Sequence, residues 1–220
     1  NKYFSIKSFR KKILNKKNNT KRITIFPISK SPLRTLNFTL INDLAKKLNN
    51  YYFDIILDKS SNISNYIDKY IFSENIVKLY PKNLCELIKE VEKVEFGIFI
   101  DSGPLHVAKI LGIRGVLLTT TVSGKKLLND FNSIDEISNN YNSNYCSAPC
   151  GLTNIFSYKN SVGCFDTLKV KKKEILNLKN FNSLQRGPLK ENYINFINNP
   201  VGCQKNINLE ILYKHIIEKL

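Results

Sequence analysis

A short polar string in the middle of the chain carries residue types that bind anions. It reads Asp101, Ser102, Gly103, Pro104, Leu105 and His106, and it follows an apolar run at 96–100 that predicts a strand. Ser102 is a typical helix N-cap, Gly103 allows a tight turn and close approach of a ligand, and Pro104 suits the first helical position. We therefore expect a strand-to-helix turn whose free amide groups suit a pyrophosphate.

The same residue types are also compatible with a turn that binds no ligand. Any strand-to-helix turn favours Asp, Ser, Gly and Pro, because these residues cap helices and form turns. A single histidine in a first helical turn, such as His106, is more often a surface or packing residue than a ligand contact.

The chain around this string alternates apolar strand patterns with amphipathic helix patterns. Strands are predicted at 23–28, 52–57, 75–80, 96–100 and 115–119, and helices at 38–48, 63–71, 84–91 and 104–111. Such alternation indicates βαβ units, and right-handed crossovers then give a Rossmann-like α/β fold, a parallel sheet with helices on both faces. In open parallel sheets ligands bind outside the carboxyl ends of the strands, which is where the string lies.

The string resembles the signature of glycosyltransferase family 9, the lipopolysaccharide heptosyltransferases and their relatives. That pattern is Asp, Ser or Thr, Gly, Pro, Leu or Met, and His, before a small-residue helix ending at Leu-Gly, as Leu111-Gly112 does here. The order of elements from about Ile23 looks like the C-terminal, donor-binding half of that family's GT-B fold. The resemblance implies an inverting, metal-independent hexosyl or heptosyl transfer from a nucleoside-diphosphate sugar, similar to ADP-heptose, to a lipopolysaccharide or related glycan acceptor.

The loop after the first predicted strand carries hydroxyl and basic side chains. By spacing, Arg34 lies at the basic position of the resembled family, and Leu36 and Asn37 replace its Trp-Pro. The resemblance implies that Ser29 or Ser31 contacts phosphate and that Arg34 neutralises the leaving diphosphate. The segment is also compatible with a solvated loop whose basic residues are incidental.

The two loops together give the predicted donor-diphosphate contacts. These are Ser29, Ser31, Arg34, Asp101, Ser102, Gly103, Pro104, Leu105 and His106. Helix amides, a basic side chain and hydroxyl groups stabilise a leaving diphosphate without a metal or other cofactor. A general base must deprotonate the acceptor hydroxyl, and in the resembled family it comes from the other half of the fold. We assign no catalytic base here and interpret Asp101 as a donor-site or structural residue.

The sequence predicts three segments. Residues 1–20 are a basic linker or the end of a missing N-terminal domain, and the lack of any methionine agrees with a missing preceding segment. Residues 21–128 are the Rossmann-like, nucleotide-sugar-binding domain. Residues 129–220 are an irregular, cysteine-containing segment that closes with an amphipathic helix.

Four of the five cysteines fall in this last segment. They are Cys146, Cys150, Cys164 and Cys203, whereas Cys85 lies in a predicted helix and is expected to be a core thiol. Four thiolates are the ligands of a structural zinc ion. A disulfide and unlinked thiols remain alternatives, since the spacing is not that of a standard zinc motif. The lack of a secretory signal argues against the disulfide.

Two other functions use the same layout as a glycosyltransferase. One is a sugar-nucleotide epimerase, which binds a similar donor for a different reaction. The other is a non-catalytic Rossmann-like module that binds a surface or a partner. An upstream Rossmann-like half with a glycine-rich loop and an acidic residue would favour the transferase.

The net charge of +16 comes from 34 Lys and Arg against 18 Asp and Glu. Such charge attracts phosphates, but the excess is nearly all Lys beside many Asn and Ile, which AT-rich codons encode. Because Arg is scarce, we expect no specific nucleic-acid partner. No apolar run approaches the roughly 18–20 residues of a membrane span, and the start does not resemble a signal peptide. We expect a cytoplasmic protein, peripheral on the inner membrane where the implied lipid-linked acceptors lie.

Residues 1–20 provide a test of this membrane association. The segment carries Lys2, Lys7, Arg10, Lys11, Lys12, Lys16 and Lys17. At about 1 kcal/mol per basic residue near an anionic surface, it would supply useful attraction. Deleting it should reduce sedimentation with anionic vesicles and leave nucleotide affinity unchanged. If the full-length and shortened proteins sediment alike, the segment has no membrane role.

Overall fold

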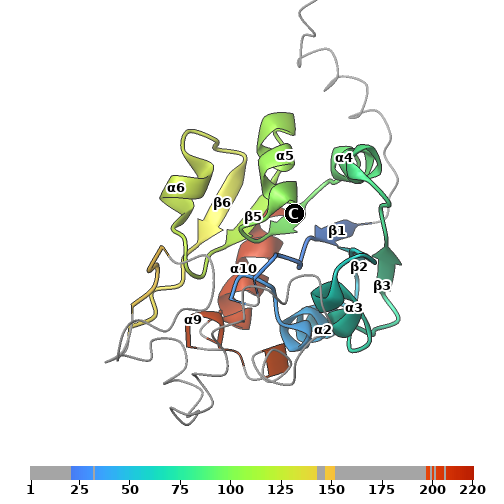
Figure 1. Ribbon diagram of the computed structural model, residues 1–220, viewed down its shortest axis with the longest axis horizontal. Coiled ribbons are helices and arrows are strands. Elements are labelled where there is room, and N and C mark those ends of the chain that lie inside the picture. The colour runs from blue at the N-terminus through green and yellow to red at the C-terminus, as the bar shows by residue number, and fades with distance from the viewer. Residues whose placement is uncertain are drawn as a thin grey trace, which may run out of the picture.

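Six parallel strands form a sheet in the computed structural model (Figure 1). The structure describes residues 21–31, 33–142, 147–151, 197–198, 200, 202–205 and 207–220. The strands are β1 (Arg22–Ile25), β2 (Tyr52–Ile56), β3 (Ile76–Leu79), β4 (Gly97–Phe99), β5 (Gly115–Leu118) and β6 (Ile134–Ile137). Their order across the sheet is β3-β2-β1-β4-β5-β6, and every pairing is parallel.

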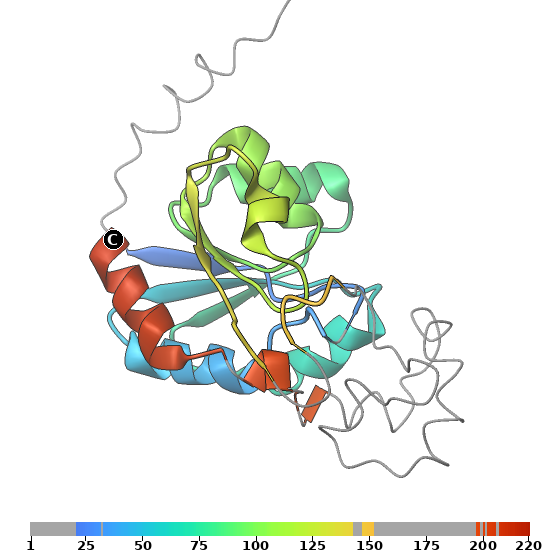
Figure 2. The same cartoon turned by 90° about the vertical axis from the view of Figure 1, so that its left-hand side faces the viewer.

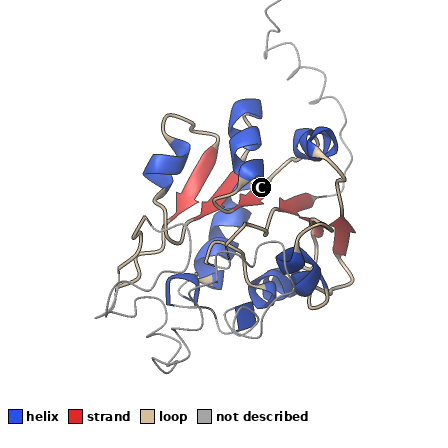
Figure 3. Ribbon diagram, viewed as in Figure 1, coloured by secondary structure: helices blue, strands red, loops and turns tan. Residues whose placement is uncertain are grey.

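Helices cover both faces of this sheet (Figures 2 and 3). They are α2 (Phe38–Lys47), α3 (Asn62–Asp68), α4 (Leu84–Glu92), α5 (Gly103–Leu111), α6 (Gly124–Leu128), α9 (Gly202–Lys205) and α10 (Leu209–Lys219). One core packs α2, α3 and α10 against the sheet, and the other packs α4, α5 and α6 against the opposite face. The predicted Rossmann-like α/β fold with helices on both faces is therefore confirmed. Among the described residues, no helix has the length and apolar character needed to cross a membrane.

Side-chain caps begin most of these helices where the sequence pattern predicts a start. Asn37, Ser61 and Asn83 each accept a hydrogen bond from an amide in the first turn of α2, α3 and α4. Asn208 does the same for α10. These caps satisfy amide groups that a helix leaves without an internal partner.

The sheet continues beyond residue 128, where the sequence analysis placed the end of the Rossmann-like domain. Strand β6 pairs with β5, but its two central residues are Asp135 and Glu136, so it lacks the apolar pattern of the other strands. Glu136 accepts hydrogen bonds from the Thr119 hydroxyl at 3.2 Å and the Gly124 amide at 2.8 Å. Charged residues are typical of an edge strand, where they discourage pairing with another chain.

Asp135 connects this edge strand to the C-terminal helix. Its carboxylate lies 2.7 Å from the Lys219 ammonium and 3.2 Å from His215 Nε2. Hydrogen bonding to Lys219 lowers the pKa of the Asp135 carboxyl, although partial burial acts in the opposite direction. Leu212 and Ile216 are fully buried on the same helix. Helix α10 is therefore part of the same packed unit as the sheet.

A stacked pair of phenylalanines explains two glycines in the middle of the sheet. The rings of Phe26 and Phe99 lie 5.0 Å apart and almost parallel. Gly97 and Gly115 are direct neighbours on β4 and β5. A Cβ atom on Gly115 would lie 2.1 Å from the Gly97 carbonyl oxygen, and one on Gly97 would lie 2.3 Å from the Phe99 ring. The Phe99 ring therefore requires glycine at position 97, and the close approach of the β4 backbone requires glycine at position 115.

Gly115→Ala tests this close approach. The added methyl group must displace backbone, so the free energy of unfolding should fall by about 1–3 kcal/mol. Urea unfolding of the wild type and variant measures the change. Gly103→Ala is the matched control, because a Cβ there meets nothing within 4 Å. Equal midpoints for Gly115→Ala and the wild type would contradict the packing described here.

Candidate functional site

A cleft of about 860 Å³ opens at the carboxyl ends of β1 to β4. Its lining includes Ser29, Lys30 and Arg34 after β1, Asp58, Ser60 and Ser61 after β2, Pro81, Lys82 and Asn83 after β3, and Asp101, Ser102, Gly103, Pro104 and His106 after β4. Strands β1 and β4 are neighbours in the sheet, although β2 and β3 separate them in sequence. The loops that follow β1 and β4 lead to opposite faces of the sheet. Open α/β sheets bind ligands in the crevice between two such loops.

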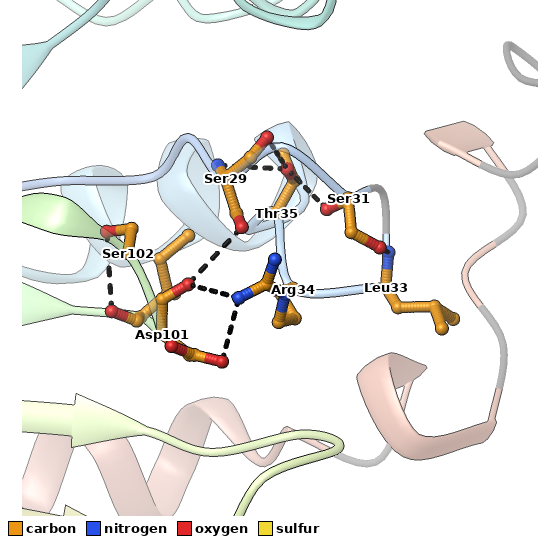
Figure 4. Close-up of polar contacts among 8 residues, drawn as sticks. Ser29, Ser31, Leu33, Arg34, Thr35, Asp101 and Ser102 are labelled. Carbon is orange, nitrogen blue, oxygen red and sulfur yellow. Dashed lines mark hydrogen bonds and ion pairs between the residues drawn. The ribbon is translucent and has the colours of Figure 1, made fainter. Parts of the chain in front are cut away.

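The loop after β1 is closed by its own hydrogen bonds (Figure 4). Thr35 Oγ1 lies 3.2 Å from the Ser29 amide that donates to it and 2.9 Å from the Ser31 carbonyl oxygen that it donates to. Ser31 Oγ accepts from the Leu33 amide at 3.3 Å. Ser31 is fully buried and does not line the cleft, so its predicted phosphate contact is not available in this arrangement. Ser29 does line the cleft.

Arg34 and Asp101 join this loop to the one after β4 (Figure 4). Arg34 Nη1 donates to Asp101 Oδ2 at 2.8 Å and to the Asp101 carbonyl oxygen at 3.2 Å. The Ser29 hydroxyl donates to the same carbonyl oxygen, also at 3.2 Å. Both charged side chains are only 16% exposed. Low exposure strengthens such an ion pair relative to one in bulk water.

Helix α5 presents an N-terminus without a side-chain cap to the cleft. Ser102 occupies the N-cap position, but its hydroxyl donates back to the Ile100 carbonyl oxygen at 3.4 Å and accepts from no helix amide. Gly103 begins the helix, and Pro104 follows as its second residue, one position later than predicted. Because a Cβ on Gly103 would meet nothing within 4 Å, a ligand can approach this turn closely.

Helix α4 starts at the same cleft with a side-chain cap. Asn83 Oδ1 accepts from the Glu86 amide at 3.0 Å, and Glu86 Oε2 accepts from the Lys82 amide at 2.8 Å. The arrangement is similar to a capping box, except that Glu86 accepts from the amide of the residue before the N-cap. Three helix starts line the cleft, those of α3, α4 and α5, and only α5 has no side-chain cap. The start of α5 is therefore the one best suited to an anion.

Two further predicted residues differ in their surroundings. His106 is exposed and lines the cleft, whereas Leu105 is fully buried in the core between α5 and the sheet. Leu105 therefore supports the turn from beneath and does not face a ligand.

The sequence analysis missed the parts of the lining that follow β2 and β3. Asp58 accepts from the Ser60 amide at 2.8 Å and from its hydroxyl at 2.6 Å, which shapes one loop. Lys82 adds a cationic side chain from the other loop. The positions of these loops in the sequence could have indicated them. Both loops follow predicted strands, and the carboxyl ends of parallel strands lie at one edge of the sheet.

The cysteines form neither a metal site nor a disulfide in the part of the chain that the structure describes. Cys150 is exposed and Cys203 is buried, while Cys146 and Cys164 lie outside the described residues. Among described side chains, no three His, Cys, Asp or Glu gather as a metal site. The structural zinc stays a prediction. Cys85 is exposed, not a core thiol, because it lies in the first turn of α4, which projects into solvent.

No family model and no curated protein match this sequence. The structure is similar to a glycosyltransferase family 9 protein from Veillonella parvula, with a TM-score of 0.54 and 12% identity over 98% of this chain and 51% of that one. E. coli ADP-heptose lipopolysaccharide heptosyltransferase II matches at a TM-score of 0.46 and 18% identity, over 62% of this chain and 44% of that one. UDP-GlcNAc 2-epimerase from Neisseria meningitidis matches at a TM-score of 0.40 and 16% identity, over 96% of this chain and 48% of that one. The chain spans about half the length of these structures, and the likeness to the V. parvula protein shows a shared fold.

Proposed function

We propose that the chain is the donor-binding part of a glycosyltransferase that takes a sugar from a nucleoside-diphosphate sugar similar to ADP-heptose. The observation that carries this proposal is the meeting of Arg34 with the uncapped start of α5 in one cleft, between β1 and β4. The acceptor we propose is a lipopolysaccharide or related glycan, lipid-linked at the cytoplasmic surface of the inner membrane.

The cleft offers what a leaving diphosphate requires. As the bond between the sugar and the diphosphate breaks, negative charge grows on the diphosphate oxygens. The Gly103 amide and the positive end of α5 stabilise that charge, as does the Arg34 guanidinium. These groups are held in place before reaction, so little reorganisation is needed when the charge develops.

The acceptor half of the reaction is not assigned to residues of this chain. The acceptor oxygen forms the new bond to the sugar, and its proton passes to a general base. The described residues supply the donor side of this step, where the diphosphate departs.

Two independent observations support a glycosyltransferase over the other functions considered. The string from Asp101 to His106 resembles the signature of glycosyltransferase family 9, and all of its residues except Leu105 line the cleft. The structure is similar to that of a glycosyltransferase family 9 protein.

Gly103→Val tests the position of the diphosphate. The wild type should bind ADP or UDP in calorimetric titration. The valine side chain points into open space, so it should block the ligand's approach to the backbone and abolish binding without changing urea unfolding. Equal nucleotide affinities in the two proteins would remove the diphosphate from this turn.

Arg34→Ala tests the cationic partner. Charge-assisted hydrogen bonds contribute roughly 1.5–3 kcal/mol, so ADP or UDP affinity should fall at least tenfold. Lys30→Ala, in the same loop, should have a much smaller effect. Arg22→Ala is the matched control, because Arg22 also pairs with a carboxylate, that of Asp54, but does not line the cleft. A larger loss from Lys30→Ala than from Arg34→Ala would identify Lys30 as the phosphate contact.

A further inference from the structure

We propose that Asp101 is a positioning residue that holds the Arg34 guanidinium in place for the donor diphosphate and does not itself contact the diphosphate. This inference rests on the proposed function, because it concerns how the same cleft recognises a diphosphate.

The hydrogen bonds of Arg34 show which of its groups are held and which are available. A guanidinium carries five N–H donors in a rigid, planar fork. Nη1 donates to Asp101 Oδ2 and to the Asp101 carbonyl oxygen. Nη2 makes no hydrogen bond to a described residue and is not fully buried, and Arg34 lines the cleft. Nη2 is therefore the group that can meet a ligand oxygen.

The remaining nitrogen indicates that Asp101 fixes this orientation. Arg34 Nε is buried without a hydrogen-bond partner among the described residues, a position that is unfavourable for a polar N–H group. The orientation of Arg34 therefore leaves one of its N–H donors without a hydrogen bond. The contacts that hold it are those to Asp101, because Nη1 makes both of its hydrogen bonds there.

The carboxylate has two opposing effects on an incoming diphosphate. It orients Arg34, which favours binding, and it places a negative charge beside the ligand, which disfavours binding. Asparagine keeps an oxygen that can accept from Nη1 but removes the charge. Alanine removes both, while the backbone carbonyl that Ser29 and Arg34 share is present in every variant. The difference between the two variants therefore isolates the orienting contact.

A double-mutant cycle measures this contact. ADP and UDP are titrated into the full chain carrying Asp101→Asn or Asp101→Ala, each with Arg34 and with Arg34→Ala. With Arg34 present, the asparagine variant should bind at least fivefold more tightly than the alanine variant. In the Arg34→Ala background the two should agree within twofold, because there is no guanidinium left to orient. Urea unfolding shows whether each variant is folded at the titration temperature.

The other outcomes separate this inference from the proposed function. Equal affinities of Asp101→Asn and Asp101→Ala with Arg34 present would overturn the positioning role. So would an asparagine–alanine difference that persists in the Arg34→Ala background, since it would mean that Asp101 contacts the nucleotide directly. A wild-type chain that binds neither nucleotide overturns the proposed function, and this inference with it.

Discussion

The ion pair between Arg34 and Asp101 is the interaction on which the cleft depends. It joins two loops 67 residues apart in sequence that leave neighbouring strands toward opposite faces of the sheet. Without a link across that division, the basic side chain and the start of α5 would have no fixed relation to each other. The Ser29 hydroxyl adds a second bond to the same carbonyl oxygen, so the junction is held from the side chain and the backbone together.

Packing in the core fixes the strand ends beneath this ion pair. Phe26 follows β1 and lines the cleft, and its ring stacks on Phe99 near the end of β4. That stack is possible because Gly97 and Gly115 leave space for the Phe99 ring. The same aromatic contact therefore ties the ends of β1 and β4 together from within the core, and the loops above them start from fixed positions.

The C-terminal part of the chain makes hydrogen bonds to the loop between β1 and α2 and to the N-cap of α2. Gln204 on α9 donates to the Thr35 carbonyl oxygen at 2.7 Å, and Asn37 donates to the Ile197 carbonyl oxygen at 3.1 Å. Thr35 is the residue whose hydroxyl closes the loop between β1 and α2. The shape of the cleft thus depends on residues that lie far outside the predicted nucleotide-binding segment.

The sequence by itself determined the alternating elements and the turn at Ser102 and Gly103, because apolar periodicity and capping chemistry act over a few residues. It did not predict β6, whose two acidic residues break the apolar pattern, nor the burial of Ser31 and Leu105, which were assigned to a ligand. It also could not predict the pairing of Asp101 with Arg34, on which the orientation of that arginine depends. Such pairings were decided by the tertiary structure alone, since local sequence shows which residues can carry charge or lie inside, whereas the order of strands brings distant side chains together.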